Sequence, residues 1–143
     1  MTHNKLITCA IGLALILCIQ LAFAAETITA RVVGVTDGDT ITVLTSERQQ
    51  IHIRLSQIDA PEKSQDFGQA SKQSLSDLVF GKDVSIEVET IDKYGRTVGK
   101  VKVGGVDANL QQINRGMAWA YTKYAYEPSF RTPFVKIVHF HAD

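Results

Sequence analysis

A short stretch in the first half of the chain combines one arginine with two carboxylates. Residues 51–62 read IHIRLSQIDAPE, in which apolar and polar residues alternate as in a half-buried strand. This alternation places Arg54 on the polar face, and Pro61 ends the strand so that Asp59 and Glu62 fall on a turn. A guanidinium and two carboxylates suit a site that binds a metal and a phosphate. A simple ion pair at a strand end would use the same residues.

Asp39 is a second candidate oxygen ligand. It lies in the turn sequence DGDT, and an Asp-Gly pair on its own indicates only a tight turn. Asp39 begins one predicted strand and Asp59 ends the next, so in antiparallel neighbours both carboxylates lie at the same end of the sheet. Oxygen-only ligands favour calcium or magnesium, with waters and a substrate phosphate completing the shell. We therefore expect weak metal binding in the absence of substrate.

Arg96 supplies a second guanidinium, at the end of the turn sequence DKYGR. Alone it fits a solvated hairpin turn. Together with Arg54 and a cation, it could stabilise the charge that builds up on a phosphodiester under attack. Glu62 would then remain to accept a proton from the attacking water, or to orient it.

The surrounding pattern predicts three strands, a helix, two strands and a second helix. The predicted strands cover residues 28–35, 40–44, 51–58, 84–89 and 100–103. The first helix is expected to be capped by Ser64, to bury a stripe that includes Phe67 and Ala70, and to stop at Gly81. Asp107 is expected to cap the second helix. This order predicts an α+β fold that is mainly β, a small five-stranded Greek-key barrel of the OB type with two or three helices.

Taken together, DGDT, RLxxIDAPE and DKYGR resemble, in the same order, the three signature segments of the staphylococcal nuclease family. The resemblance covers residues 27–124. It implies an OB-fold, calcium-dependent phosphodiesterase that acts on DNA and RNA and leaves 3′-phosphate ends. It assigns catalytic roles to Arg54, Glu62 and Arg96.

The same resemblance assigns calcium to Asp39, Asp59 and the carbonyl oxygen of Ala60. It places Tyr94 beside the phosphate of the nucleotide and Tyr124 at the pocket. For Tyr124, and likewise for Tyr121 and Trp119, the aromatic ring could equally serve to pack the core or the rim.

The chain ends depart from this domain. Residues 1–24 have the basic start, apolar run and small-x-small end of a secretory signal peptide, or alternatively of an uncleaved anchor helix. Both cysteines, Cys9 and Cys18, lie in this leader, so the mature protein would have no disulfide. The expected domain covers residues 25–128. Residues 129–143 form an atypical tail whose His139 and His141 could bind a metal or lie in solvent, and which we expect to lower stability.

The charge balance excludes a strongly basic nucleic-acid-binding protein. The sequence has 15 Lys and Arg residues against 15 Asp and Glu residues, and loss of the leader removes only Lys5. Local arginines and a bound cation would therefore have to attract single-stranded or frayed DNA and RNA. We expect the protein to be exported, either to the periplasm or to the medium, and to be a monomer. An OB module that binds nucleic acid with little or no turnover is the alternative, and Glu62 distinguishes the two because a pure binder needs no such carboxylate. An exported protein-interaction domain would leave the arginines and aspartates unexplained.

Overall fold

The computed structural model describes residues 26–121. The predicted leader, the atypical tail with its histidine pair, and Tyr124 lie outside the described residues. Within the described range, β1 (Thr27–Val35), β2 (Thr40–Leu44) and β3 (Gln50–Leu55) form an antiparallel meander. They are followed by β4 (Ile58–Asp59), α2 (Gly68–Val79), β5 (Asp83–Ile91), β6 (Thr97–Val103), β7 (Val106–Asp107), α3 (Ala108–Asn114) and β8 (Trp119–Ala120).

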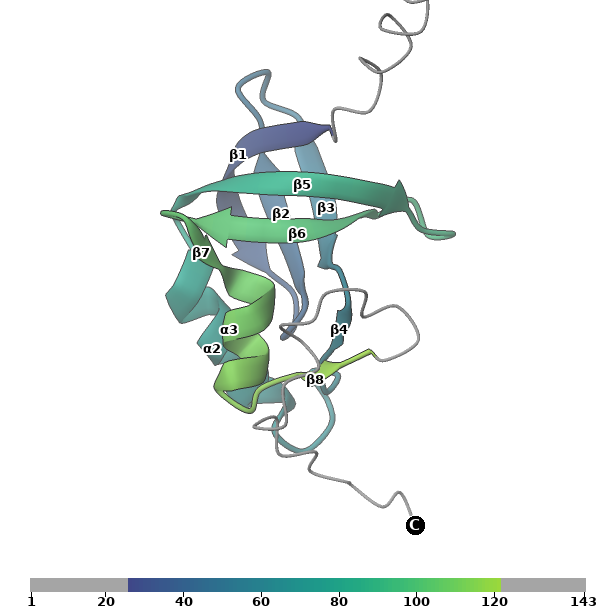
Figure 1. The fold of residues 1–143 in the computed structure, drawn as a ribbon, viewed down its shortest axis with the longest axis vertical. Helices are drawn as coiled ribbons and strands as arrows, with labels where there is room; N and C mark the ends of the chain where they lie inside the picture. Colours follow the sequence, from purple (N-terminus) through teal and green to yellow (C-terminus); the bar gives the residue numbers. More distant parts are fainter. Residues whose placement is uncertain (1–25, 122–143) are drawn as a thin grey trace, which may run out of the picture.

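Five of these strands close into a barrel. The order runs β3, β2, β1, β5, β6, and β6 returns to pair with β3 in parallel, with Ile53 opposite Thr97 and Leu55 opposite Gly99. Figure 1 shows β5 and β6 crossing in front of the meander while α2 and α3 lie together at one end. The predicted α+β fold, a five-stranded OB-type barrel with helices, is confirmed.

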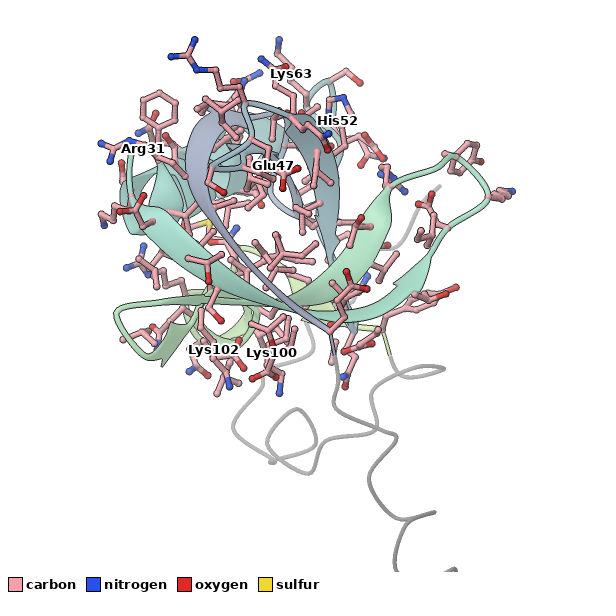
Figure 2. All side chains as sticks on the ribbon, turned by 90° about the horizontal axis from the view of Figure 1, so that it is seen from above. Arg31, Glu47, His52, Lys63, Lys100 and Lys102 are labelled. Carbon is pink, nitrogen blue, oxygen red and sulfur yellow. The ribbon has the colours of Figure 1, made fainter. Side chains whose placement is uncertain are left out.

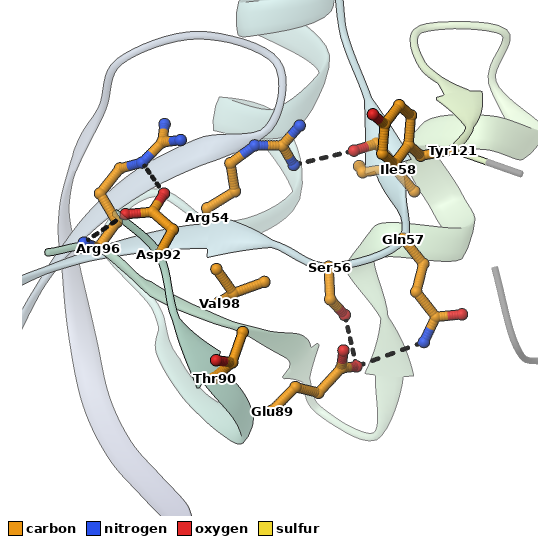
Figure 3. A pocket seen from close by; sticks show the side chains of 10 residues that line it. All are labelled: Arg54, Ser56, Gln57, Ile58, Glu89, Thr90, Asp92, Arg96, Val98 and Tyr121. Atoms are coloured by element: carbon orange, nitrogen blue, oxygen red, sulfur yellow. Dashed lines mark hydrogen bonds and ion pairs between the residues drawn. The ribbon is translucent and has the colours of Figure 1, made fainter. Parts of the chain in front are cut away.

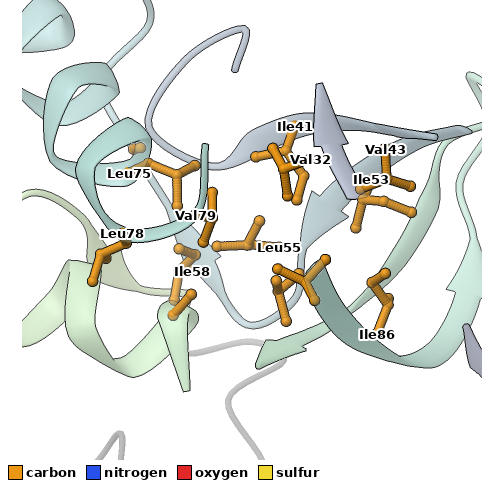
Figure 4. Packing of buried hydrophobic residues seen from close by; sticks show 14 of the residues in the cluster. Val32, Ile41, Val43, Ile53, Leu55, Ile58, Leu75, Leu78, Val79 and Ile86 are labelled. Carbon is orange, nitrogen blue, oxygen red and sulfur yellow. The ribbon is translucent and has the colours of Figure 1, made fainter. Parts of the chain in front are cut away.

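The core fills the space between the barrel and α2. The β-branched and leucine residues that alternate along each strand point inward, because side chains on a strand alternate between its two faces. Figure 4 shows Leu75, Leu78 and Val79 of α2 packed towards Leu55 and Ile58. This cluster anchors the β3–β4 segment, which carries several of the predicted site residues.

Two predicted boundaries were wrong. The strand expected over residues 51–58 breaks at Ser56 and Gln57, where Gln57 adopts φ 61° and the chain restarts as β4. The first helix begins at Gly68 and not after Ser64; its N-cap is Phe67, at φ 64° and without a side-chain cap. Phe67 and Ala70 are exposed, so the buried face is carried by Ser71, Ser74, Leu75, Leu78 and Val79.

Other local predictions were correct. The Asp107 carboxylate accepts a hydrogen bond from the Leu110 backbone N–H and caps α3. Gly81, just past α2, adopts φ 72°, the left-handed conformation in which glycine commonly ends helices.

Charged side chains of both signs are spread around the barrel. Figure 2 shows Arg31, Lys63 and Lys102 pointing outward from different parts of the chain, and Glu47 is exposed in the β2–β3 connection. Among the described residues, no helix has the length and apolar character needed to cross a membrane.

Candidate active site

Arg54 is fixed by four acceptors at the end of the meander. Its Nη1 donates to the carbonyl oxygens of Leu55 (2.7 Å) and Ile58 (2.9 Å). Its Nη2 lies 3.1 Å from Asp59 Oδ1 and 3.4 Å from Asp39 Oδ2. The break after β3 makes this possible, because it turns the chain back so that its own carbonyls meet the guanidinium. The two carboxylates predicted to share one end of the sheet therefore do so, with Arg54 between them.

Asp39 is the most buried member of this group. Its Oδ2 accepts the Ala60 backbone N–H (3.0 Å), and its Oδ1 accepts the Thr40 hydroxyl (3.0 Å). Burial raises the Asp39 pKa to about 6, although the positive charge of Arg54 acts in the opposite direction. A buried carboxylate whose negative charge Arg54 balances only in part is stabilised by a further cation nearby.

Arg96 is held from a different strand pair. Asp92, at the start of the β5–β6 turn, accepts Arg96 Nε at 2.7 Å and the Arg96 backbone N–H at 2.9 Å. Burial acts to raise the Asp92 pKa, but these hydrogen bonds and the guanidinium charge hold it below its ordinary value. Arg96 Nη1 also lies 3.5 Å from Thr40 Oγ1, so Thr40 links Arg96 to Asp39.

Both arginines line one cavity of about 610 Å³. Its other lining residues are Ser56, Gln57, Ile58, Glu89, Thr90, Asp92, Val98 and Tyr121. Figure 3 shows Arg54 and Arg96 on one side of this cavity and Glu89 across from them. The volume falls within the range usual for small-molecule sites. Two guanidiniums at one side of such a cavity can bind a phosphate.

Glu62 and Tyr94 lie at the periphery. The Glu62 side chain is exposed, and within residues 26–121 its carboxylate forms no hydrogen bond or ion pair with the two arginines or the two aspartates. The Glu62 backbone N–H donates to Gln65 Oε1 at 2.7 Å. Tyr94 is 72% exposed at the tip of the β5–β6 turn, with Arg96 Cζ 5.6 Å from its ring centre.

The oxygen ligands present are of the type that a hard cation such as calcium prefers, but they are too few to complete its coordination shell. Among the described residues, no group of three or more His, Cys, Asp and Glu side chains is placed to hold a metal. Asp39, Asp59 and the Ala60 carbonyl oxygen offer oxygen atoms only, as calcium prefers. Water and substrate oxygens would have to supply the remaining ligands.

Sequence reasoning missed the far side of the cavity. Glu89 Oε1 accepts the Ser56 hydroxyl at 2.8 Å and Gln57 Nε2 at 3.3 Å. Tyr121, for which the sequence left open a packing role, lines the cavity and is 43% exposed. The sequence signal that could have indicated this side of the cavity was the polar pair Ser56-Gln57, which interrupts a run that we expected to continue as a strand.

Comparison with known proteins identifies the family of this chain. A family model described as staphylococcal nuclease homologue matches residues 52–135. The chain is 46% identical over 119 residues to a Haemophilus influenzae protein described as an uncharacterized endonuclease, covering 83% of this chain and 67% of the relative. It is 44% identical over 102 residues to a micrococcal nuclease of Shigella flexneri, covering 65% of this chain and 58% of the relative. The chain thus spans about three fifths to two thirds of these relatives, and it belongs to the staphylococcal nuclease homologue family.

Proposed function

We propose that this chain is an exported, calcium-dependent nuclease that hydrolyses phosphodiester bonds of DNA and RNA and leaves 3′-phosphate ends. Membership of the family and the nuclease names of its relatives support the nuclease activity. The observation that carries the proposal is the convergence of Arg54 and Arg96 on one cavity, connected through Thr40 and Asp39.

The two arginines bind the phosphate and stabilise its transition state. Each guanidinium is already oriented by carbonyl or carboxylate acceptors, so little reorganisation is needed when charge builds up on the equatorial oxygens. Removal of one such preorganised donor typically lowers kcat by about 10²–10³-fold.

Glu62 acts as the general base. Arg54, Arg96, Asp39 and Asp59 form what we call the arginine–aspartate network. Among the described residues, the exposed carboxylate of Glu62 has no competing partner in this network, which leaves it able to accept a proton. The water oxygen forms a bond to phosphorus, and the water proton passes to Glu62. The bond between phosphorus and the 5′-oxygen breaks, and the leaving 5′-oxygen takes a proton from solvent. The phosphate therefore stays on the 3′ side.

Asp39, Asp59 and the Ala60 carbonyl oxygen hold calcium. The burial of Asp39 and the all-oxygen donor set support this assignment. When bound, the ion supplies Lewis-acid stabilisation of the phosphate charge. Because these residues provide few ligands, the affinity for calcium should rise when a substrate phosphate is present.

Tyr94 and Tyr124 contact the nucleotide. Support for Tyr94 comes from its exposure beside Arg96, whereas Tyr124 lies outside the described residues. A single-stranded or frayed substrate suits a cavity of this size better than a duplex.

We further propose that residues 1–24 direct export and are then removed, and that the protein acts as a monomer. Mass spectrometry and light scattering on protein recovered from the periplasm and the medium test both points.

A nucleic-acid-binding module with little turnover is the second candidate. The lack of contact between the Glu62 carboxylate and the arginine–aspartate network favours it. Cleavage of end-labelled single-stranded DNA, with calcium and with chelator, separates the two candidates. The nuclease proposal expects calcium-dependent products with 3′-phosphate ends; binding without products in either condition supports the module.

A further inference from the structure

The side of the cavity opposite the arginines carries a carboxylate that the proposed mechanism does not use. Glu89 lies across the cavity from Arg54 (Figure 3). A negative charge here disfavours a second phosphate. It favours a group with hydrogen-bond donors.

An irregularity in β5 brings Glu89 to this place. Val88 pairs with Gly99 and Thr90 pairs with Val98, so Glu89 is the extra residue of a β-bulge. A bulge can redirect a side chain, and bulges occur often beside active sites. Two residues earlier on the same strand, Glu87 forms an ion pair with Lys102 instead.

A second irregularity supplies the groups that hold Glu89. Gln57 has φ 61°, a conformation that non-glycine residues rarely adopt and that often marks functional sites. This break after β3 directs the Ser56 hydroxyl and the Gln57 amide to the same oxygen, Glu89 Oε1. Among the described residues, Glu89 Oε2 accepts no hydrogen bond, so it can accept donors from a ligand.

Part of the cavity wall is apolar or aromatic and suits a flat ring. Val98, Ile58 and the Tyr121 ring line it. An aromatic ring offers a stacking surface for any base, whereas a carboxylate distinguishes bases by their donors.

We propose that Glu89 is a specificity-determining residue that selects guanine next to the phosphate bound by Arg54 and Arg96. Guanine alone has two adjacent donors, N1–H and the N2 amino group, on its Watson–Crick edge. Thymine and uracil present one N–H between two carbonyl oxygens, which a carboxylate repels. The inference rests on the proposed function for the position of the phosphate.

Thymidine hexamers with one central guanine, cytosine, adenine or thymine test this proposal. Cleavage in calcium is mapped on gels, and binding in chelator is measured by fluorescence anisotropy. We expect the full chain to prefer the guanine hexamer over the all-thymine hexamer by about tenfold in both measurements.

Glu89→Gln keeps the shape of the side chain but turns an amide N–H₂ towards the base. The preference for the guanine hexamer should therefore fall by about tenfold, which removes it, or reverse towards thymine. Glu87→Gln makes the same charge change on the same strand and should keep the guanine preference. Glu89→Ala should abolish discrimination without reversing it. Glu89 is exposed and Glu87 is only partly buried, at a surface ion pair, so we expect all three variants to fold, and thermal melting checks this.

The outcomes separate this inference from the proposed function. Cleavage with equal rates for all four hexamers, or a guanine preference that survives in Glu89→Gln, overturns the inference and leaves the nuclease proposal standing. Guanine-selective binding that depends on Glu89 without any cleavage supports the inference and removes the nuclease proposal.

Discussion

The arginine–aspartate network and the Glu62 loop are built in opposite ways. In the network, Arg54, Asp39 and Arg96 are partly or largely buried, and each makes several hydrogen bonds or ion pairs with strand residues. In the loop, the Glu62 backbone is held by Gln65, while its side chain is exposed. The groups proposed to stabilise charge are thus fixed before substrate arrives, and the group proposed to move a proton is not.

This difference suggests a division between stability and activity. Buried, multiply bonded groups affect folding when they are changed, whereas an exposed carboxylate without partners does not. Substitutions in the network should therefore lower both activity and stability. Substitutions at Glu62 should lower activity alone.

Glu62→Gln provides the largest expected effect on rate. The amide cannot accept the water proton, so kcat on single-stranded DNA should fall by about 10³-fold. The free energy of unfolding should change by no more than about 0.5 kcal/mol, because the side chain is exposed. Quenched-flow or gel kinetics and urea denaturation measure the two quantities. Glu47→Gln, an exposed carboxylate in the β2–β3 connection, is the matched control. Unchanged kcat in Glu62→Gln would remove the general base from the mechanism.

Arg54→Lys should lower both kcat and the free energy of unfolding. A lysine ammonium keeps the charge but cannot reach two carbonyl oxygens and two carboxylates with the geometry of a guanidinium. We expect kcat to fall by about 10²-fold and the free energy of unfolding by about 1–3 kcal/mol. Arg31→Lys, at a surface ion pair with Asp83, should change neither. Full stability in Arg54→Lys would break the contrast between the network and the loop.

The parts of the site that the sequence predicted lie on regular elements. The alternation along residues 51–55 predicts the strand face on which Arg54 lies. The antiparallel pairing of β2 with β3 predicts that Asp39 and Asp59 lie at the same end of the sheet. Both follow from the two-residue period of a strand. The sequence did not predict the cap of α2 or the position of Glu89. These depend on Phe67 and Gln57 at positive φ and on a bulge in β5, which tertiary packing imposes against local preference.

Asp39 should make the stability of the metal-free protein fall as pH rises. Its folded pKa of about 6 lies above its ordinary value of 3.8, so its contribution is complete below pH 3.8 and is lost as pH rises through about 6. Compared with Asp39→Asn, the wild type should lose up to about 3 kcal/mol across this window. Urea denaturation of both proteins in chelator, at several values between pH 4 and 7, measures the difference. A wild type that gains stability relative to Asp39→Asn as pH rises would contradict the buried position of this carboxylate.

Gly38→Ala tests how closely the turn that carries Asp39 must pack against α2. A Cβ at position 38 would lie 1.7 Å from Ser71 Oγ and 2.8 Å from both Ser71 Cβ and Ala60 Cβ. The hydroxyl can rotate away, but the two Cβ atoms are bonded directly to packed backbone and cannot move without it, so the turn itself must shift. Gln112 Nε2 holds the same turn by donating to the Gly38 carbonyl oxygen at 2.8 Å. We expect a loss of about 2 kcal/mol in the free energy of unfolding.

The matched control is Gly34→Ala, where a new Cβ would meet Thr42 Cβ at an ordinary 3.5 Å. Gly34→Ala should lower the free energy of unfolding much less than Gly38→Ala does. Because a shifted turn also moves Asp39 away from Ala60 N–H and Arg54, Gly38→Ala should weaken calcium binding in titration calorimetry, whereas Gly34→Ala should not. Equal stability and equal calcium affinity in the two variants would mean that the network tolerates movement of the Asp39 turn. In that case the rigidity of the arginine–aspartate network would have to come from Arg54 and its carbonyl acceptors alone.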